Sequence, residues 1–170
     1  MSSLAWCLTG AGHWLSQSLD LALARNDVDF FLSRAAEEVL ALYGLEGRLA
    51  RRPLFLDRQA SSPLSGRLAR GDYGSLVVAP ATSNSVAKFV LGLSDSLVTT
   101  LFAQAGKSRV PVAVLPTDTA PEMESVDPKG QTVVVRPRPL DLAYVERLAA
   151  FPGVTVLTSP EALAIWLERR

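Results

Sequence analysis

Four small polar side chains, Thr82, Ser83, Asn84 and Ser85, stand directly after a short apolar run and before a helical pattern. The run Val77 to Ala79 predicts a buried strand, and the helical face that follows consists of Val86, Phe89, Val90 and Leu93. Ser83 or Asn84 can cap this helix, because a short side-chain oxygen accepts a free backbone N–H there. Several donors would then meet at the positive end of a helix dipole, which suits an anion or the polar edge of a ring. A well-capped turn without a ligand is the alternative.

Three other predicted strands also end in small or polar residues. Leu4 to Leu8 is followed by Gly10, Ala11, Gly12 and His13; Val28 to Leu32 by Ser33; and Val110 to Leu115 by Pro116, Thr117 and Asp118. In parallel sheets ligands bind at the carboxyl ends of strands, so we expect these groups to join Ala81 to Ser85 in one ligand site. Glycine allows the backbone to approach a ligand closely, but the full GxGxxG pattern of dinucleotide sites is absent. Ser33 could equally be a helix cap.

Few residues with acid–base or metal-binding chemistry accompany these turns. His13 is the only histidine, and the only cysteine, Cys7, lies within a predicted strand. This distribution favours neither a hydrolytic site nor a metal site. A protein of this kind often relies on a bound cofactor for its chemistry. His13 could contact the ligand or simply begin a helix, and Lys88 could face the ligand or solvent.

The elements that would position these residues alternate between short apolar strands and helical patterns. The strand that contains Val77 to Ala79 is expected to begin at Ser75, and further strands are expected at Thr132 to Val135 and Val154 to Leu157. Helices are expected through Leu15 and Leu23, from Arg34 to Tyr43, after a cap at Ser94 or Asp95, from Leu140 to Ala150, and after Ser159. The polar segment between Asp118 and Gly130 predicts a loop. This alternation predicts an α/β fold in which helices cover both faces of a mostly parallel sheet.

The segment Gly44 to Asp72 lacks clear periodicity and is rich in arginine. Its six arginines are Arg48, Arg51, Arg52, Arg58, Arg67 and Arg70. A solvated loop with a short helix is the simpler interpretation. The alternative is a rim that receives the phosphate or carboxylate of a second ligand, since guanidinium groups suit such anions.

Composition limits the partners of this protein. The 170 residues match the length of one domain, with 48% apolar residues and a mean hydropathy of +0.21. We interpret the surplus hydrophobicity as a subunit interface, with a large core as the alternative. The net charge of zero favours neither nucleic acid nor an anionic membrane as a partner. Because no run could cross a bilayer, no secretory signal is visible and a single cysteine excludes an internal disulfide, we expect a cytoplasmic protein.

Two motifs resemble those of a known family. The stretch PATSNSVAKFVLGLSDSLVTT, which begins at Pro80, resembles the signature of the homo-oligomeric flavin-containing cysteine decarboxylases. That signature reads roughly P-A-S-A-N-T, followed by a helix and I-A-D-N-L, and its second part stands here as Leu93 to Leu97. The opening TGAGHWL is similar to the family's first flavin-binding turn. The resemblance covers nearly the whole chain.

The resemblance implies a single Rossmann-like (flavodoxin-like) three-layer domain over residues 1–170 that binds FMN. It implies that Gly10, Ala11 and Gly12 lie against FMN and that Ser33 and the turn Thr82 to Ser85 bind its phosphate, ribityl chain or ring edge. The other residues expected to contact FMN are His13, Ala81, Pro116, Thr117 and Asp118. Asp95 would support the pocket at a subunit boundary. The same resemblance implies a homotrimer, or a larger assembly of trimers, with the flavin at the interface.

Departures from the family's motifs indicate the branch. The decarboxylases carry a catalytic histidine shortly before the third strand, whereas Ser61 to Asp72 contains none. The prenyl-flavin synthases carry Arg-Glu-Thr-Pro after their fourth long strand, where this chain has Leu115 to Asp118. Four stretches together look most like the branch of archaeal flavoproteins and dihydromethanopterin reductases. They are TGAGH, RGDYGSLVVAPATSNSVAK, VAVLPTD and the closing VVVRPRPLDLAYVERLAAFPGVTVL.

The resulting hypothesis is an FMN-dependent oxidoreductase. It would pass reducing equivalents from an external donor (reduced flavin, a nicotinamide or a ferredoxin-like protein) to a pterin, taking dihydromethanopterin to tetrahydromethanopterin. One alternative is an electron-transfer flavoprotein that docks a ferredoxin-like partner. Another is a flavin-dependent decarboxylase, against which the missing histidine argues.

Overall fold

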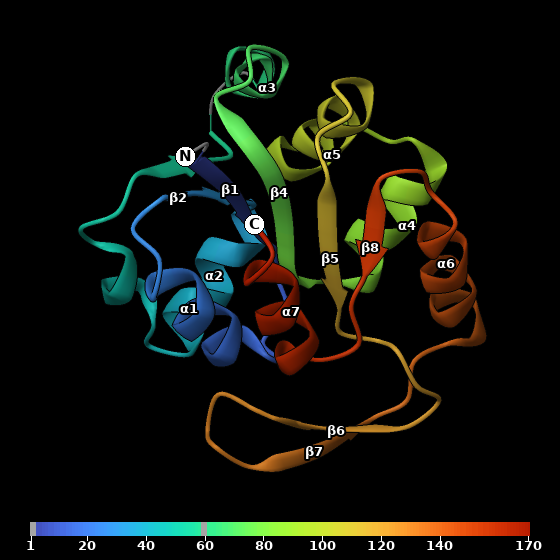
Figure 1. The fold of residues 1–170 in the computed structure, drawn as a ribbon. Helices are drawn as coiled ribbons and strands as arrows, with labels where there is room; N and C mark the ends of the chain where they lie inside the picture. The colour runs from blue at the N-terminus through green and yellow to red at the C-terminus, as the bar shows by residue number, and fades with distance from the viewer. Residues whose placement is uncertain (1–2, 59–60) are drawn as a thin grey trace.

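A computed structural model of the protein describes residues 3–58 and 61–170 and contains a six-stranded parallel sheet between two layers of helices (Figure 1). The sheet comprises β1 (Ser3–Leu8), β2 (Val28–Leu32), β3 (Leu54–Leu56), β4 (Tyr73–Ala81), β5 (Val112–Pro116) and β8 (Val154–Val156). The helices are α1 (Leu15–Leu23), α2 (Arg34–Leu42), α3 (Ser61–Ala69), α4 (Ser83–Leu91), α5 (Leu97–Lys107), α6 (Pro139–Ala149) and α7 (Pro160–Leu167), with a short 3₁₀ helix at Glu46–Leu49.

The two layers follow from the alternation of side chains along the strands. In β1, Leu4, Trp6 and Leu8 pack with apolar residues of α1, α2 and α7 on one face of the sheet. Ala5 and Cys7 point to the opposite face, where α3, α4, α5 and α6 supply the packing. Because both faces are covered, the central strands are buried almost throughout, as parallel sheets require. The predicted Rossmann-like three-layer architecture is therefore confirmed.

Strand order determines where a ligand can enter. The sheet runs β3-β2-β1-β4-β5-β8, so β1 lies between β2 and β4. The chain proceeds outward from β1 to β2 and β3, then returns to the other side of β1 to form β4. Without the edge strand β3, this is the flavodoxin-like order, in which the switch in direction opens a crevice at the carboxyl ends of the two central strands.

The segment after β5 differs from the sequence-based expectation. Met123–Val126, which we expected to be loop, forms β6, and Thr132–Val135 forms β7 as its antiparallel partner. The two strands make a separate ribbon that extends beneath the carboxyl edge of the main sheet (Figure 1). The sequence also gave no indication of β3 within the arginine-rich segment. In the described residues, no helix is long and apolar enough to cross a membrane.

Candidate functional site

Two buried side chains, Thr9 and Trp6, join the carboxyl ends of β1 and β4. Thr9 donates a hydrogen bond from Oγ1 to the carbonyl of Pro80, 2.8 Å away, and accepts one from the N–H of Thr82 at 3.0 Å. Trp6 adds a bond from its indole N–H to the carbonyl of Ala79 at 2.9 Å. These contacts hold the polar turn after β4 against the glycine turn after β1.

The polar turn begins α4, but its cap differs from the predicted one. Thr82, rather than Ser83 or Asn84, is the N-cap, and its side chain accepts the N–H of Ser85 at 3.1 Å. The N–H groups of Ser83 and Asn84 have no hydrogen-bond partner in the part of the chain that the structure describes. They therefore face the crevice as free donors at the positive end of the helix. Leu93, expected on the buried face of α4, lies beyond its end and is exposed.

Three helix N-termini meet at one cavity of about 570 Å³ beside this turn. Ser33 caps α2, Thr82 caps α4 and Ser96 caps α5, and all three line the cavity. Ser96, not Ser94 or Asp95, caps α5 through a reciprocal capping box with Thr99. The positive ends of three helix dipoles therefore lie at this cavity, which suits a phosphate group.

We call this space the anion cavity, and charged side chains complete its lining. Arg34 lines it and donates from Nε to the carbonyl of Asp57 at 3.2 Å. Lys88 lines it as well and bonds both carboxylate oxygens of Asp95, at 2.7 and 3.0 Å. Lys88 thereby holds the pKa of Asp95 below its usual range. Lys88 is thus not a solvated side chain, and any ligand that contacts it would do so beside its ion pair with Asp95.

A second cavity of about 480 Å³ opens on the other side of the same turn. Gly10, Thr82 and Asn84 line both cavities, so the two spaces adjoin along the turn. The second cavity is bounded by the ends of β1, β4 and β5 on one side and by the β6–β7 ribbon on the other. Its ribbon wall is mostly apolar and includes Met123, Val126, Val133 and Val135. We call this space the ribbon slot, and its volume and mostly apolar lining suit a ring system.

The ribbon is attached to the body of the protein by His13 and Tyr43. Nδ1 of His13 lies 3.0 Å from Oγ of Ser125, and the Tyr43 hydroxyl donates to the carbonyl of Val126 at 2.9 Å. Nε2 of His13 is buried without a partner among the described residues. Burial lowers the pKa of His13, and the nearby carboxylate of Asp118 partly opposes this change. His13 is therefore a partly buried group at the slot whose pKa lies below its ordinary value.

Asp118 lies across the slot from the ribbon and is held by α4. Its Oδ2 accepts a short hydrogen bond from the hydroxyl of Ser83. The preceding residue, Thr117, donates from its backbone N–H to the carbonyl of Ala81 at 3.0 Å. Both β5 and α4 thus determine where the Asp118 carboxylate points.

The two glycines after β1 are required by packing inside the protein. A Cβ at Gly10 would lie 2.6 Å from Cβ of Ala35, and one at Gly12 would lie 2.2 Å from Oη of Tyr43. Each distance is too short for a real contact. We predicted these glycines from the need for close ligand approach, but close approach of α2 is a sufficient reason for them.

Most of the predicted site residues do come together. Gly10, Ala11, Gly12, His13, Ser33, Thr82, Ser83, Asn84, Ser85, Asp95, Thr117 and Asp118 line one cavity or both. Ala81 and Pro116 line neither, because they are buried and paired with each other across β4 and β5. Their place is in the sheet beneath the site.

The arginine-rich segment does not form a rim at this site. Four of its arginines pair with nearby carboxylates: Arg48 with Asp20, Arg58 with Glu37, Arg67 with Asp29 and Asp72, and Arg70 with Asp72. None of the six arginines lines either cavity. The basic residue that does reach the site is Arg34. Its position directly after Ser33 was visible in the sequence.

Sequence reasoning did not identify Tyr43, Ser96, Thr99 or the residues of the ribbon as part of the site. The capping-box spacing of Ser96 and Thr99 was a usable signal for the α5 N-terminus. No comparable local signal marks Met123, Ser125 or Tyr43, because their place in the site depends on contacts between distant segments.

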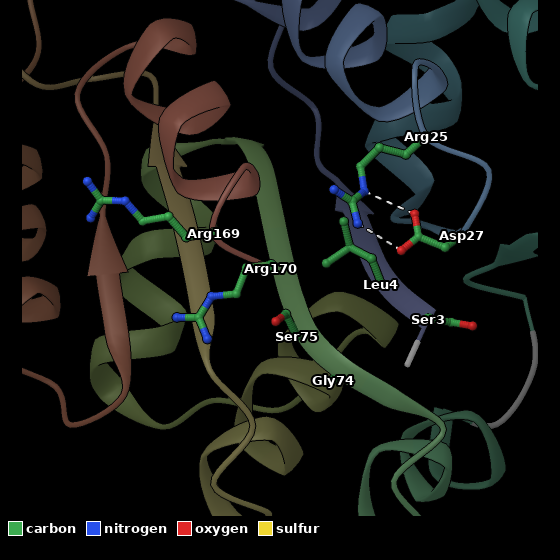
Figure 2. A pocket seen from close by; sticks show the side chains of 8 residues that line it. All are labelled: Ser3, Leu4, Arg25, Asp27, Gly74, Ser75, Arg169 and Arg170. Atoms are coloured by element: carbon green, nitrogen blue, oxygen red, sulfur yellow. Dashed lines mark hydrogen bonds and ion pairs between the residues drawn. The ribbon is translucent and has the colours of Figure 1, made fainter. Parts of the chain in front are cut away.

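Another cavity, of about 420 Å³, lies at the opposite, amino-terminal edge of the sheet (Figure 2). Arg25, Arg169 and Arg170 surround it, and the guanidinium of Arg25 bonds both oxygens of Asp27 at 2.8 and 3.0 Å. Strand ends of this kind are not where parallel sheets bind ligands. The positive charge of Arg25 is also already balanced by Asp27.

Fold and site together define a class: an α/β protein whose topological switch point can hold a phosphate-bearing ring compound. The family model described as Flavoprotein matches residues 2–169, and the chain belongs to that family. The dihydromethanopterin reductase (acceptor) of Methanosarcina mazei is 34% identical over 230 aligned positions, covering 94% of this chain and 96% of that protein. The dihydromethanopterin reductase (acceptor) of Methanocaldococcus jannaschii is 42% identical over 130 positions, covering 68% of this chain and 53% of that protein.

A solved structure is similar over almost the entire chain. The crystal structure of Burkholderia xenovorans DmrB in complex with FMN, described as a cubic protein cage for redox transfer, matches with a TM-score of 0.90. It is 42% identical, and the match covers 99% of this chain and 94% of that one.

Proposed function

We propose that this protein is an FMN-dependent dihydromethanopterin reductase. The observation that carries the proposal is the pair of adjoining cavities, one rich in hydrogen-bond donors and one mostly apolar, that share Gly10, Thr82 and Asn84. The first suits the phosphate of FMN, and the second has room for rings. The names and identities of the relatives from Methanosarcina mazei and Burkholderia xenovorans support the reaction and the cofactor.

The residues fit FMN by the chemistry of their donors. The hydroxyls of Ser33, Ser85 and Ser96 and the guanidinium of Arg34 would bind the phosphate, together with the free N–H groups at the start of α4. The turn Thr82 to Asn84 would contact the ribityl chain and the edge of the ring. Gly10, Ala11 and Gly12 would lie beside it, with Asp95 holding Lys88 in place.

Bound FMN supplies the hydride or electrons that this reaction needs. The protein would bind and orient the two ring systems, and the ribbon would exclude water from the slot. An external donor (reduced flavin, a nicotinamide or a ferredoxin-like protein) would restore the reduced cofactor. His13 is the imidazole at the slot, and it could exchange a proton there through the nitrogen that contacts Ser125.

The assembly belongs to the same proposal. We expect residues 1–170 to form one FMN-binding domain, and the domains to assemble as a homotrimer or a larger assembly of trimers, in the cytoplasm. Apolar side chains left exposed on the surface, including Leu91, Leu93, Val126 and Val134, support a subunit interface. The neighbour described as a cubic cage is consistent with trimers arranged around a cavity.

A visible absorbance spectrum of the purified protein tests the proposal. We expect a flavin spectrum that bleaches with dithionite under nitrogen and returns when dihydromethanopterin is added. Bleaching without reoxidation by the pterin would instead support an electron carrier for a ferredoxin-like partner. Failure to bind FMN would contradict both the pterin reductase and the electron carrier.

A further inference from the structure

We propose that Asp118 determines specificity for the second ligand by pairing with the amino-pyrimidinone edge of a pterin. This inference rests on the proposed function and adds the residue that would recognise the substrate. Three observations carry it. Asp118 lines the ribbon slot, the other carboxylate there (Asp127) is bonded within the β6–β7 turn, and a carboxylate matches this ring edge.

Asp118 is the carboxylate of the slot that the turn between β6 and β7 does not use. Asp118 and Asp127 both line the slot. Oδ1 of Asp127 accepts the backbone N–H groups of Lys129 and Gln131, each at 2.8 Å, and so forms the turn between β6 and β7. Oδ1 of Asp118 has no hydrogen-bond partner among residues 3–58 and 61–170, and its Oδ2 is held by Ser83 alone.

Ser83 gives this carboxylate a fixed orientation before a ligand arrives. Ser83 is the first residue of α4, and Asp118 follows β5, so both ends of the Ser83–Asp118 bond start from rigid elements. A carboxylate oxygen can accept more than one hydrogen bond. Asp118 can therefore keep its bond to Ser83 and still receive two donors from a ligand.

The donor pattern of a pterin edge matches a carboxylate. Its ring N–H and exocyclic amino group lie side by side and can donate two parallel bonds to the two carboxylate oxygens, as a guanidinium does. The corresponding edge of a flavin has one N–H between two carbonyl oxygens, which a carboxylate would repel. Asp118 therefore suits the pterin better than the flavin. This assignment differs from our sequence-based expectation that Asp118 contacts FMN.

The remaining walls suit the flat faces of the same ring. Met123, Val126, Val133 and Val135 line the slot from the ribbon, and they offer apolar contact without competing hydrogen bonds. A pterin ring held with its face against this wall would present its edge to Asp118. Polar recognition would then be concentrated on one side chain, as is common in ligand sites.

The test compares two pteridines on the protein loaded with oxidised FMN. The probes are unsubstituted pterin and lumazine, in which a carbonyl oxygen replaces the exocyclic amino group, and binding is measured by equilibrium dialysis. We expect the wild-type protein to prefer pterin by at least about tenfold, since a site built for a donor rejects the analogue that lacks it. This comparison requires no variant.

Two variants sharpen the result. In Asp118→Asn, the amide can accept the ring N–H and donate to a neighbouring carbonyl oxygen of either pteridine, so we expect the preference for pterin to be lost. Glu124→Gln removes one negative charge from the exposed outer part of the same ribbon and should leave the preference unchanged. Visible absorbance checks that each variant carries FMN.

The outcomes separate this inference from the proposed function. Equal binding of the two probes to the wild-type protein, or an unchanged preference in FMN-loaded Asp118→Asn, would overturn the role of Asp118 alone. If the FMN-loaded wild-type protein bound neither pteridine, the proposed pterin reductase would fail together with it.

Discussion

His13 and Ser125 are 112 residues apart in the chain, yet Nδ1 of His13 lies 3.0 Å from Oγ of Ser125. This contact attaches the β6–β7 ribbon to the turn after β1. The other side-chain link nearby is the bond from Tyr43 to the carbonyl of Val126. The wall of the ribbon slot therefore depends on a small number of polar contacts.

Removal of the Ser125 hydroxyl should loosen the ribbon. We expect Ser125→Ala to lose a hydrogen bond worth about 1 kcal/mol and to speed amide hydrogen exchange across residues 123–135. Ser16→Ala, at an exposed position on α1, is the matched control. Unchanged exchange in the ribbon of the Ser125 variant would mean that the His13–Ser125 bond does not hold it.

Stability should fall in mild acid because of His13. Burial lowers the pKa of His13 in the folded protein below its ordinary value of 6.5, so the unfolded chain binds a proton first as the pH falls. The free energy of unfolding should therefore be fully present above about pH 6.5 and decrease as the pH falls toward the lower, folded pKa. Urea titrations at a series of pH values measure this slope.

His13→Asn provides the comparison for that slope. His13 is the only histidine, so the variant should show a flatter dependence of stability on pH between about pH 6.5 and 5, above the range in which ordinary carboxyl groups titrate. An equally steep slope in the variant would show that another group is responsible.

Packing of α2 against the turn after β1 should make Gly10 intolerant of a side chain. In Gly10→Ala the new methyl would meet Cβ of Ala35, and the strain should cost about 1–3 kcal/mol. Ala35→Gly in the same chain should recover most of this loss, because it removes the opposing methyl. Gly47→Ala is the control, since nothing lies within 4 Å of its added Cβ. Thermal unfolding of the wild type, Gly10→Ala, the double variant and Gly47→Ala measures these effects. If the double variant did not recover stability, the Gly10–Ala35 contact would not be the cause of the loss.

The anion cavity should distinguish FMN from riboflavin, which lacks the phosphate. If Arg34 contacts that phosphate, Arg34→Ala should weaken FMN binding by about tenfold through loss of a charged hydrogen bond and leave riboflavin binding nearly unchanged. Arg51→Ala is the control, because Arg51 is exposed and makes no hydrogen bond or ion pair with the described residues. Flavin fluorescence titrations give both affinities. An equal loss for both flavins would place the effect of Arg34 away from the phosphate.

Local patterns were enough to predict the central elements of the site. The apolar run before Pro80 and the helical spacing after Ser85 predicted β4 and α4, and the same logic predicted the strand before Gly10. These patterns are reliable because a strand buried on both faces and an amphipathic helix each leave a distinct spacing of apolar residues. The convergence of strand ends followed from the rule that parallel strands share one carboxyl edge.

The helix caps were harder to place to the residue. Thr82, Ser83 and Asn84 can all cap a helix, and the choice depends on the backbone that Thr9 holds in place from β1. Ser96 was likewise passed over for its neighbours Ser94 and Asp95. Short polar side chains in a row are nearly equivalent locally, so contacts with other segments decide among them.

The sequence by itself therefore determined the α/β alternation, the polar turns and their meeting at one edge of the sheet. Tertiary structure alone decided that residues 123–135 form a ribbon over that edge, that Tyr43 and His13 bind it, and that Asp118 is oriented by Ser83. The physical reason is the range of the interactions involved. Apolar periodicity records burial against the core at every residue, whereas a few hydrogen bonds between distant, partly exposed segments leave no periodic pattern in the chain.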